Sequence, residues 1–491
     1  MSMRLIRSLL DHLGQPTLAL AGPDGECGFD RLGARAGAVQ AALRRLPAGA
    51  VLIHGHKEAD AVAAMLACAA DARPFCFVDR SQPPARVERV ARIAGAVCLI
   101  ACGEPPACAL PTLRAADLAD APLSPGADAP DEAVFYYIFT SGSSGEPKGI
   151  AISRGNFAAF DDWYGPQLAI SPGDGLHLNH ANLAFDMGML DLWPVLSRGR
   201  GVLMLDHANN ALPRQNLRLM QRYAARLRSA MATPSFMATL CRDALFRAEG
   251  FPALADIYIA GEAAPPALCA QLFERFPAAR RWNGYGPSET TCMSHTQALA
   301  PEVRSAAALS SFDAASAHCR VEVWNAAGEP VIGEAGEVVI FGPQVAGGYL
   351  PASLPQNRAF GERNGERYYR SGDGGTLDAD GRLWLHGRLD RQVKINGNRV
   401  ELAEIERRAL ACPGVEEAVA MAHQDDGGVE LLLFVGGAAE AAALAGYLAR
   451  HLPPYMLPRR IFHSQALPFN RNGKIDRARL LAEASRAQEV A

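Results

Sequence analysis

The sequence lacks long hydrophobic runs and an excess of charge of one sign. Its 491 residues have a mean hydropathy of −0.01. The sequence contains no stretch of about 18 apolar residues without charge, which a membrane span requires. The start, MSMRLIRSLLDHLG, has too short an apolar piece for a secretory signal. Lys+Arg 48 against Asp+Glu 52 gives a net charge of −4, which excludes a chain-wide basic character. We therefore expect a cytoplasmic protein with neither a membrane nor a nucleic acid as partner.

The sequence also lacks paired cysteines. None of its 11 cysteines forms a CxxC motif, and the closest spacing is Cys98 to Cys102. Most lie in apolar segments, such as Cys68 in AAMLACAAD. We expect reduced, buried thiols that pack like small hydrophobic side chains, not a disulfide framework or a zinc site.

The first part of the chain alternates helical and strand patterns. RLGARAGAVQAALRRL and EADAVAAMLACAAD have helical periodicity, whereas AVLIHG, ARPFCFVD and GAVCLIA are short apolar runs typical of buried strands. This alternation predicts parallel sheets with crossover helices. Residues 103–131, rich in Pro, Ala and Asp, are predicted to be a surface connection. The segment around GEVVIFG, from Gly336, predicts a small β-rich subdomain.

The last hundred residues have a different pattern. Glu401 to Ala411 predicts an amphipathic helix, and two apolar strands flank Asp425-Asp426-Gly427-Gly428, a hairpin signal. AAEAAALAGYLARHL predicts a second helix. The fold class is therefore α/β, with a large multi-lobed N-terminal domain (residues 1–389) and a small, mobile α+β C-terminal domain (residues 390–491).

The most informative local segment is YYIFTSGSSGEPKGI, Tyr136 to Ile150. An apolar strand runs into a loop of hydroxyl and glycine residues followed by a lysine, namely Thr140, Ser141, Gly142, Ser143, Ser144, Gly145 and Lys148. Glycines let backbone N–H groups turn toward an anion, and hydroxyls and lysine add donors and charge. The loop is suited to polyphosphate but is not a Walker A loop, because GxxxxGK[ST] is absent. An ordinary Ser/Gly turn is the alternative.

The loop is the first of eight motifs that follow one another along most of the chain. They are TSGSSGEPKG (from Thr140), FDMGMLDLWPVL (185–196), IAGEAAP (259–265), NGYGPSETT (283–291), GEVVIFGPQVAGGYL (336–350), YRSGDGG (369–375), GRLDRQVKINGNRVELAEIE (387–406) and NRNGKIDR (470–477). In this set the sequence resembles the adenylate-forming superfamily, and within it the amino-acid-activating adenylation domains of nonribosomal peptide synthesis. The resemblance implies attack of a carboxylate on the α-phosphorus of ATP, with Mg²⁺, and then transfer of the acyl group to a thiol.

The resemblance also implies a role for individual residues. The phosphate loop and Thr290 would bind the ATP phosphates, Glu289 would hold Mg²⁺, and Lys474 would be the catalytic lysine that bridges the substrate carboxylate and the α-phosphate. Asp390 would be the hinge, and Gly397 would line the pantetheine tunnel. The adenosine part would contact Gly261, Glu262, Asn283, Gly284, Tyr285, Gly286, Asp373 and Arg388. Asn396 and Ala403 stand where the family commonly has arginine and glycine, which weakens the inference for the thioester step.

Asp186 indicates the class of acid. In the amino-acid-activating branch an aspartate at this place pairs with the substrate ammonium, and a buried ammonium needs such a carboxylate. A helix-starting aspartate is the alternative. The other pocket positions, none of them charged, would be Met187, Leu190, Ser235, Tyr258, Ala260, Gly284, Cys292 and Met293. Tyr258 would shorten the pocket and Gly284 would open one wall, so the expected substrate is a small or medium uncharged L-amino acid.

The acceptor is predicted from the length of chain beyond the last motif. Only about fifteen residues come after NRNGKIDR, which predicts a stand-alone ligase acting on a separate phosphopantetheinylated carrier protein. A monomer is expected only from the resemblance to the family. Free coenzyme A as acceptor of a small acid lacking an amino group is the first alternative, and an inactive scaffold relative is the second. A requirement for an activator protein stays open.

Overall fold

The computed structural model describes residues 2–126, 129–140, 146–168, 175–210, 213–301, 305–313, 315–316, 318–395, 397–425, 428–464, 467–468, 477, 479–482 and 484. The chain forms two compact units. The large unit comprises Met1–Arg80, Ala91–Phe139 and Gly149–Asp390, and the small unit comprises Ser81–Val90, Thr140–Lys148 and Arg391–Ala491. Among the described residues, no helix combines the length and apolar character that a membrane crossing requires.

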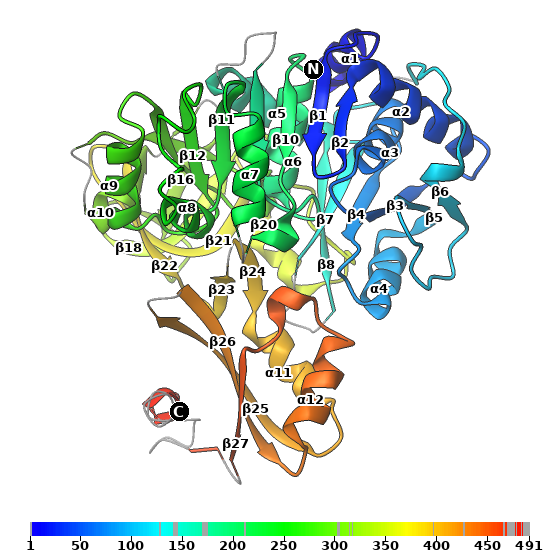
Figure 1. The fold of residues 1–491 in the computed structure, drawn as a ribbon. Helices are drawn as coiled ribbons and strands as arrows, with labels where there is room; N and C mark the ends of the chain where they lie inside the picture. The colour runs from blue at the N-terminus through cyan, green and yellow to red at the C-terminus, as the bar shows by residue number, and fades with distance from the viewer. Residues whose placement is uncertain are drawn as a thin grey trace. The chain divides into compact units, whose positions relative to one another are not determined.

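Two largely parallel sheets form the centre of the large unit (Figure 1). The first has the order β14 (His295–Ala298), β13 (Arg280–Tyr285), β12 (Asp256–Ala260), β11 (Leu227–Ala232), β9 (Leu176–Asn179), β10 (Gly201–Met204), β1 (Leu18–Gly22) and β2 (Gly25–Gly28). The second has the order β19 (Tyr349–Leu350), β8 (Lys148–Ser153), β7 (Val134–Thr140), β4 (Phe75–Asp79), β3 (Ala50–Gly55), β5 (Ala96–Ala101) and β6 (Thr112–Arg114). Antiparallel pairing occurs at the sheet edges, where β2, β14 and β19 lie.

Helices cover these sheets and share one core with them. Residues of α5 (Arg154–Gln167) and α6 (Asp186–Leu196) belong to the same buried cluster as Val51 of the second sheet and Val202 of the first. The remaining helices of this unit are α1 (Ser2–His12), α2 (Phe29–Leu43), α3 (Ala59–Ala70), α7 (Arg214–Arg222), α8 (Pro234–Cys241), α9 (Pro266–Arg275) and α10 (Ala306–Leu309), with α4 (Pro84–Ala94) divided between the units. The shared core fixes the carboxyl ends of the strands of both sheets, from which the loops of the candidate site arise.

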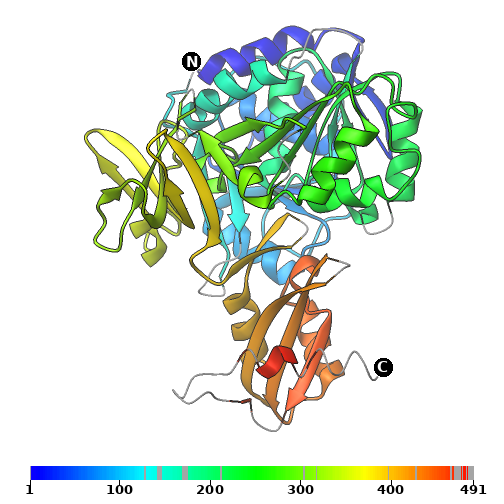
Figure 2. The same ribbon diagram turned by 90° about the vertical axis from the view of Figure 1, so that its left-hand side faces the viewer.

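A third, antiparallel sheet completes the large unit. Its order is β15 (Ser311–Asp313), β22 (Arg382–Arg388), β21 (Glu366–Leu377), β18 (Ala335–Phe341), β16 (Arg320–Trp324) and β17 (Pro330–Val331), with β20 (Phe360–Arg363) paired to β21. Figure 2 shows this sheet, in yellow, as a lobe at one side of the parallel sheets. It is the β-rich subdomain that the sequence around Gly336 predicts.

The small unit has its own α+β core. In it, α11 (Leu402–Leu410) and α12 (Ala441–Ala449) pack on a sheet of β25 (Val415–Asp425), β26 (Gly428–Gly437) and β27 (Arg460–Ser464). The hairpin of β23 (Gln392–Ile395) and β24 (Asn398–Glu401) precedes α11. The predicted helices and strands of this part are thus confirmed.

Most predicted elements of the first part are confirmed as well. The helices α2 and α3 and the strands β3, β4 and β5 lie where their periodicity predicts. Residues 103–131, predicted to be a surface connection, are mostly exposed or partly exposed where they are described, and the structure adds strand β6 (Thr112–Arg114) and a 3-10 turn (Ala115–Asp117) that the sequence did not predict. Three residues are too few to show a strand period. All eleven cysteines are free thiols, and nine are buried.

Candidate active site

A hydrogen-bonded group joins the end of a parallel strand to the antiparallel sheet. The hydroxyl of Tyr285, the last residue of β13, donates to Asp373 Oδ2 at 2.8 Å, and Arg388 Nη1 donates to Asp373 Oδ1 at 3.0 Å. Asp373 and Arg388 are register partners in the β21–β22 pair. Burial, and then the neighbouring Asp373, raise the pKa of Tyr285, so its hydroxyl stays a donor. The carboxylate of Asp373 retains lone pairs for further donors such as the two hydroxyls of a ribose.

The guanidinium of Arg388 also binds the last residue of the large unit. Its Nε and Nη2 donate to Asp390 Oδ1 and Oδ2 at 3.0 and 2.7 Å, and the Asp390 side chain is 43% exposed. Glycine is favoured at position 372, because its φ is +73° and a Cβ would lie 2.7 Å from Arg388 Nη2. Asp390 is therefore held by Arg388 at the point where the chain leaves the large unit.

Asn283 offers a buried acceptor. Its Nδ2 donates to the Leu309 carbonyl at 2.7 Å, which fixes the orientation of the amide, and only 3% of the residue is exposed. Its Oδ1 is buried with no hydrogen-bond partner among the described residues. A buried acceptor without a donor costs free energy, so this atom is suited to a ligand N–H such as an adenine amino group.

The loop after β13 is strained and is held by a side chain that sequence reasoning missed. Thr291 and Cys292 have φ of 55° and 70°, values uncommon for residues with a Cβ. Gln344, fully buried, donates from Nε2 to the carbonyls of Thr290 and Met293 at 3.1 and 3.0 Å. Its Oε1 accepts from the indole of Trp163. The motif GEVVIFGPQVAGGYL marks this segment, but spacing alone does not show what Gln344 contacts.

Glu289 provides a buried carboxylate next to this loop. It is 0% exposed, and its Oε1 accepts from the hydroxyl of Tyr349, which lies 2.9 Å from the hydroxyl of Tyr369. Mg²⁺ binds carboxylate, phosphate and water oxygens, and a carboxylate that keeps further lone pairs can supply one of them. The donor chemistry of Glu289 therefore fits a magnesium ion bound together with a polyphosphate.

The predicted phosphate loop is described only at its ends. Ser141, Gly142, Ser143, Ser144 and Gly145 lie outside the described residues. Thr140 ends β7, and its buried Oγ1 has no hydrogen-bond partner in the described part of the chain. Lys148 begins β8. Thr290, predicted to contact a phosphate, donates its hydroxyl to the Pro287 carbonyl at 3.0 Å, and its phosphate contact stays a prediction.

Asp186 is the first residue of α6, as the helix-start interpretation predicts. Its Oδ1 accepts from the Met187 N–H at 2.7 Å, and the side chain is half-buried. Burial raises the pKa of Tyr136, and the carboxylate of Asp186 raises it further. A helix-start aspartate can also bind a ligand cation, because its carboxylate accepts several donors at once. The two interpretations of Asp186 are therefore compatible.

Methionine side chains narrow the predicted substrate pocket. A Cβ on Gly284 would lie 2.1 Å from Met293 Sδ, and one on Gly261 would lie 2.7 Å from Met187 Sδ. Met293 therefore occupies the space beside Gly284, where the sequence predicts an open wall of the pocket. Tyr258 is buried, and its hydroxyl donates to the Gln167 carbonyl at 2.7 Å.

The other predicted residues lie in both units. Leu190, Ala260 and Cys292 are buried, and the Ser235 N–H donates to Glu262 Oε2 at 3.0 Å. A Cβ on Gly286 would lie 2.6 Å from the Ser294 nitrogen, so this position needs glycine. Gly397, with φ of 78°, lies between β23 and β24 of the small unit. Lys474 and Asn396 lie outside the described residues.

Comparison with known proteins gives consistent matches over most of the chain. The model of the AMP-binding enzyme family matches residues 16–350, and that of the AMP-binding enzyme C-terminal domain matches residues 404–474. The D-alanine--D-alanyl carrier protein ligase of Bacillus cytotoxicus is 31% identical over 452 residues, 88% of this chain and 89% of the relative. The protein of that name from Bacillus velezensis is 31% identical over 447 residues, 88% of each chain.

Solved structures match the fold over nearly the whole chain. Holo-PA1221, described as an NRPS protein containing adenylation and PCP domains, has a TM-score of 0.82 at 25% identity, covering 97% of this chain and 84% of its own. IdnL1 has a TM-score of 0.77 at 24% identity, covering 95% and 99%. The similarity to IdnL1 shows the fold alone.

Proposed function

Because the chain belongs to the AMP-binding enzyme family, and is therefore an AMP-forming ligase, we propose that it activates a small amino acid as its aminoacyl-adenylate. We further propose that it transfers the aminoacyl group to the phosphopantetheine thiol of a carrier protein. D-alanine is the first candidate substrate, since relatives 31% identical over 88% of this chain are D-alanine--D-alanyl carrier protein ligases. The observation that supports a small substrate most strongly is the filling of the space beside Gly284 by Met293.

The adenosine part of ATP is assigned to the strand end at Tyr285. Asn283 Oδ1 would accept from the adenine amino group, and Tyr285 would stack on the base. Asp373 would accept from the ribose hydroxyls while Arg388 and Tyr285 keep its carboxylate oriented. Gly261, Glu262, Gly284 and Gly286 would line the same part of the site. Preformed hydrogen bonds of this kind reduce the ordering cost of binding.

The reaction itself needs charge stabilisation and alignment more than a protein nucleophile. Thr140, Lys148, the loop between them and Thr290 would bind the phosphates. Glu289 would hold Mg²⁺, which neutralises phosphate charge when bound. Lys474 would place its ammonium between the substrate carboxylate and the α-phosphate, where negative charge develops. We assign the mobile lid to residues 390–491, with Asp390 as its hinge and Gly397 in the pantetheine tunnel.

The substrate ammonium is assigned to Asp186. Its carboxylate lies at the start of α6, where it is half-buried and accepts from the Met187 N–H. Met187, Leu190, Ser235, Tyr258, Ala260, Cys292 and Met293 would surround the substrate side chain. Since none of these side chains is charged, a charged substrate side chain would be desolvated without a partner.

Amino-acid-dependent exchange of labelled pyrophosphate into ATP tests the first step. The panel comprises D- and L-alanine, glycine, serine, 2-aminobutyrate and valine, together with propionate and lactate as acids of matched size without an amino group. We expect the strongest exchange with D-alanine. Exchange with L-alanine alone would overturn the stereochemical assignment, and exchange with propionate alone would indicate a ligase for acids lacking an amino group.

The acceptor is tested separately by mass spectrometry of the product. The enzyme is incubated with ATP, alanine and either a phosphopantetheinylated carrier protein or free coenzyme A. We expect the aminoacyl mass on the carrier, and a carrier without phosphopantetheine is the control. If coenzyme A were acylated while the phosphopantetheinylated carrier stayed without an aminoacyl group, the proposed acceptor would be contradicted and the activation step would remain supported.

A further inference from the structure

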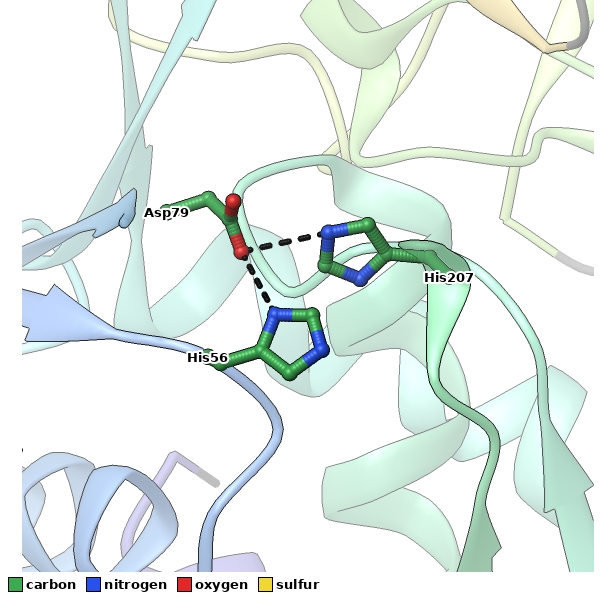
Figure 3. A group of neighbouring side chains, drawn as sticks. All are labelled: His56, Asp79 and His207. Carbon is green, nitrogen blue, oxygen red and sulfur yellow. Dashed lines mark hydrogen bonds and ion pairs between the residues drawn. The ribbon is translucent and has the colours of Figure 1, made fainter. Parts of the chain in front are cut away.

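Three side chains that the proposed reaction does not use converge at the carboxyl ends of strands from two sheets (Figure 3). His56 follows β3 directly and Asp79 ends β4, both in the second sheet. His207 follows β10 of the first sheet and begins the 3-10 turn His207–Asn209. Asp79 is 1% exposed and His56 is 6% exposed. Two members of the cluster are thus buried and His207 is partly exposed, and the cluster lies where the two parallel sheets meet within one unit.

The spacing of the three polar atoms fits metal ligands as well as hydrogen-bonded groups. His56 Nδ1 and His207 Nε2 lie 3.1 and 3.2 Å from the same oxygen, Asp79 Oδ2, and all three atoms lie within 4.8 Å of one another. Tetrahedral bonds of about 2.0–2.1 Å place two ligand atoms about 3.3 Å apart. Two imidazoles and a carboxylate also form a donor set that divalent transition metals prefer.

A second carboxylate orients the first imidazole. His56 Nε2 lies 2.8 Å from Asp206 Oδ1, and that oxygen also accepts from the Ala208 N–H at 2.9 Å. When Nε2 carries the proton for Asp206, the lone pair of His56 Nδ1 faces Asp79. Metal-binding histidines commonly donate their other ring N–H to a carboxylate in this way.

The amide of Asn182 indicates which ring nitrogen of His207 carries the proton. Asn182 Oδ1 accepts from the Ala184 N–H at 2.8 Å, so its Nδ2 faces His207 Nε2 at 3.0 Å. Because an amide nitrogen only donates, His207 Nε2 is the acceptor and has a lone pair. That lone pair lies 3.2 Å from Asp79 Oδ2, which is also an acceptor. In this tautomer the proton of His207 is on Nδ1, a buried atom with no hydrogen-bond partner among the described residues. A cation bound by His207 Nε2 and Asp79 Oδ2 would satisfy both acceptors.

We propose that His56, Asp79 and His207 bind one divalent transition-metal ion, with Zn²⁺ as the reference metal and water as the fourth ligand. The ion takes the place of the proton that would otherwise bridge these groups. Asp79 ends a strand of the second sheet, and His56 and His207 follow strands of the second and first sheets, so the bound ion would connect the two sheets.

The test uses full-length, tag-free protein dialysed against EDTA. Co²⁺ titration followed by visible absorption, and Zn²⁺ titration by calorimetry, should each saturate at one ion per chain. Zn²⁺ should also raise the thermal midpoint by several degrees, because a ligand that binds only the folded state stabilises it. No saturable binding by the wild-type protein would overturn the proposal and indicate a hydrogen-bonded cluster without metal.

Three variants define the ligands. His207→Gln and Asp79→Asn should weaken Zn²⁺ binding at least tenfold, and His177→Gln is the matched control. His177 is a fully buried imidazole in β9 that bonds Ser229 and lies outside the cluster. Circular dichroism verifies that each variant is folded. Unchanged Zn²⁺ affinity in folded His207→Gln would assign the metal to other residues and overturn the proposal.

Discussion

At the scale of single residues, the size of the proposed substrate is set by a contact between a glycine and a methionine. Met293 is 2% exposed, and its sulfur occupies the position where a side chain on residue 284 would begin. Replacing a buried methionine by alanine leaves space for about three heavy atoms. A larger amino acid could use that space, whereas the substrate of the native pocket would lose contacts.

We therefore predict that Met293→Ala shifts the preference from alanine toward 2-aminobutyrate and valine. The ratio of kcat/KM for valine over alanine should rise about tenfold or more, since one or two buried methylenes contribute about 1–3 kcal/mol. Pyrophosphate exchange measures this ratio. Met237→Ala is the control, because Met237 is fully buried in α8 outside the predicted pocket. An equal shift in both variants would contradict the placement of Met293.

At the scale of elements, the loop from Glu289 to Met293 depends on an amide from a distant segment. Gln344 donates to two of its carbonyls, and Thr291 donates its hydroxyl back to the Gln344 carbonyl at 2.7 Å. Positive φ values at Thr291 and Cys292 cost about 1–3 kcal/mol each and persist only when the surroundings hold them.

We predict that Gln344→Ala lowers both stability and activity. Leaving two carbonyls and the Trp163 indole without partners should reduce the free energy of unfolding by about 2–4 kcal/mol. The KM for the amino acid should rise, because Cys292 and Met293 lose their support. Asn325→Ala is the control, since the Asn325 side chain accepts from the Ala327 and Glu329 N–H groups in a turn outside the site. Denaturant unfolding and exchange kinetics check both effects, and an unchanged KM in a folded variant would refute the coupling.

The periodic elements were predictable from sequence, whereas the loop contacts were not. Alternating apolar helices and strands predict α2, β3, α3 and β4, because burial imposes their periods on the sequence. Gln344 and Met293 have no such signal, since their roles depend on which segments of the chain meet in space. The three-residue strand β6 was missed for a related reason, because its pairing with β5 comes from the sheet edge and not from its own pattern.

At the scale of the whole molecule, the proposed reaction assigns separate tasks to the two units. The large unit contains Asp186, Asn283, Glu289 and Asp373, whereas Lys474 belongs to the small unit. The order of the motifs along the chain was enough to predict all five residues as site residues. In the large unit, the structure adds Gln344, Tyr349 and Tyr369, which the sequence did not single out.

We predict that Lys474→Ala reduces adenylate formation about 10²–10³-fold, the usual effect of removing a group that stabilises transition-state charge. ATP affinity should change little, because the adenosine contacts assigned to the large unit remain. Equilibrium binding of ATP and single-turnover adenylate formation separate the two effects. Lys394→Ala, which removes an exposed lysine of the same unit, is the control. Adenylation at the wild-type rate would remove Lys474 from the mechanism.

The central claim is that the carboxylate of Asp186 recognises a substrate ammonium. It is tested most directly by the ratio of exchange rates with alanine and propionate, measured for wild type and Asp186→Asn. Loss of an ion-paired hydrogen bond costs about 1.5–3 kcal/mol, so the alanine-to-propionate ratio of kcat/KM should fall about 10- to 100-fold. Asp30→Asn, at the first turn of α2, should leave it unchanged. An unaltered ratio in Asp186→Asn would contradict the assignment of this enzyme to amino acid activation through Asp186.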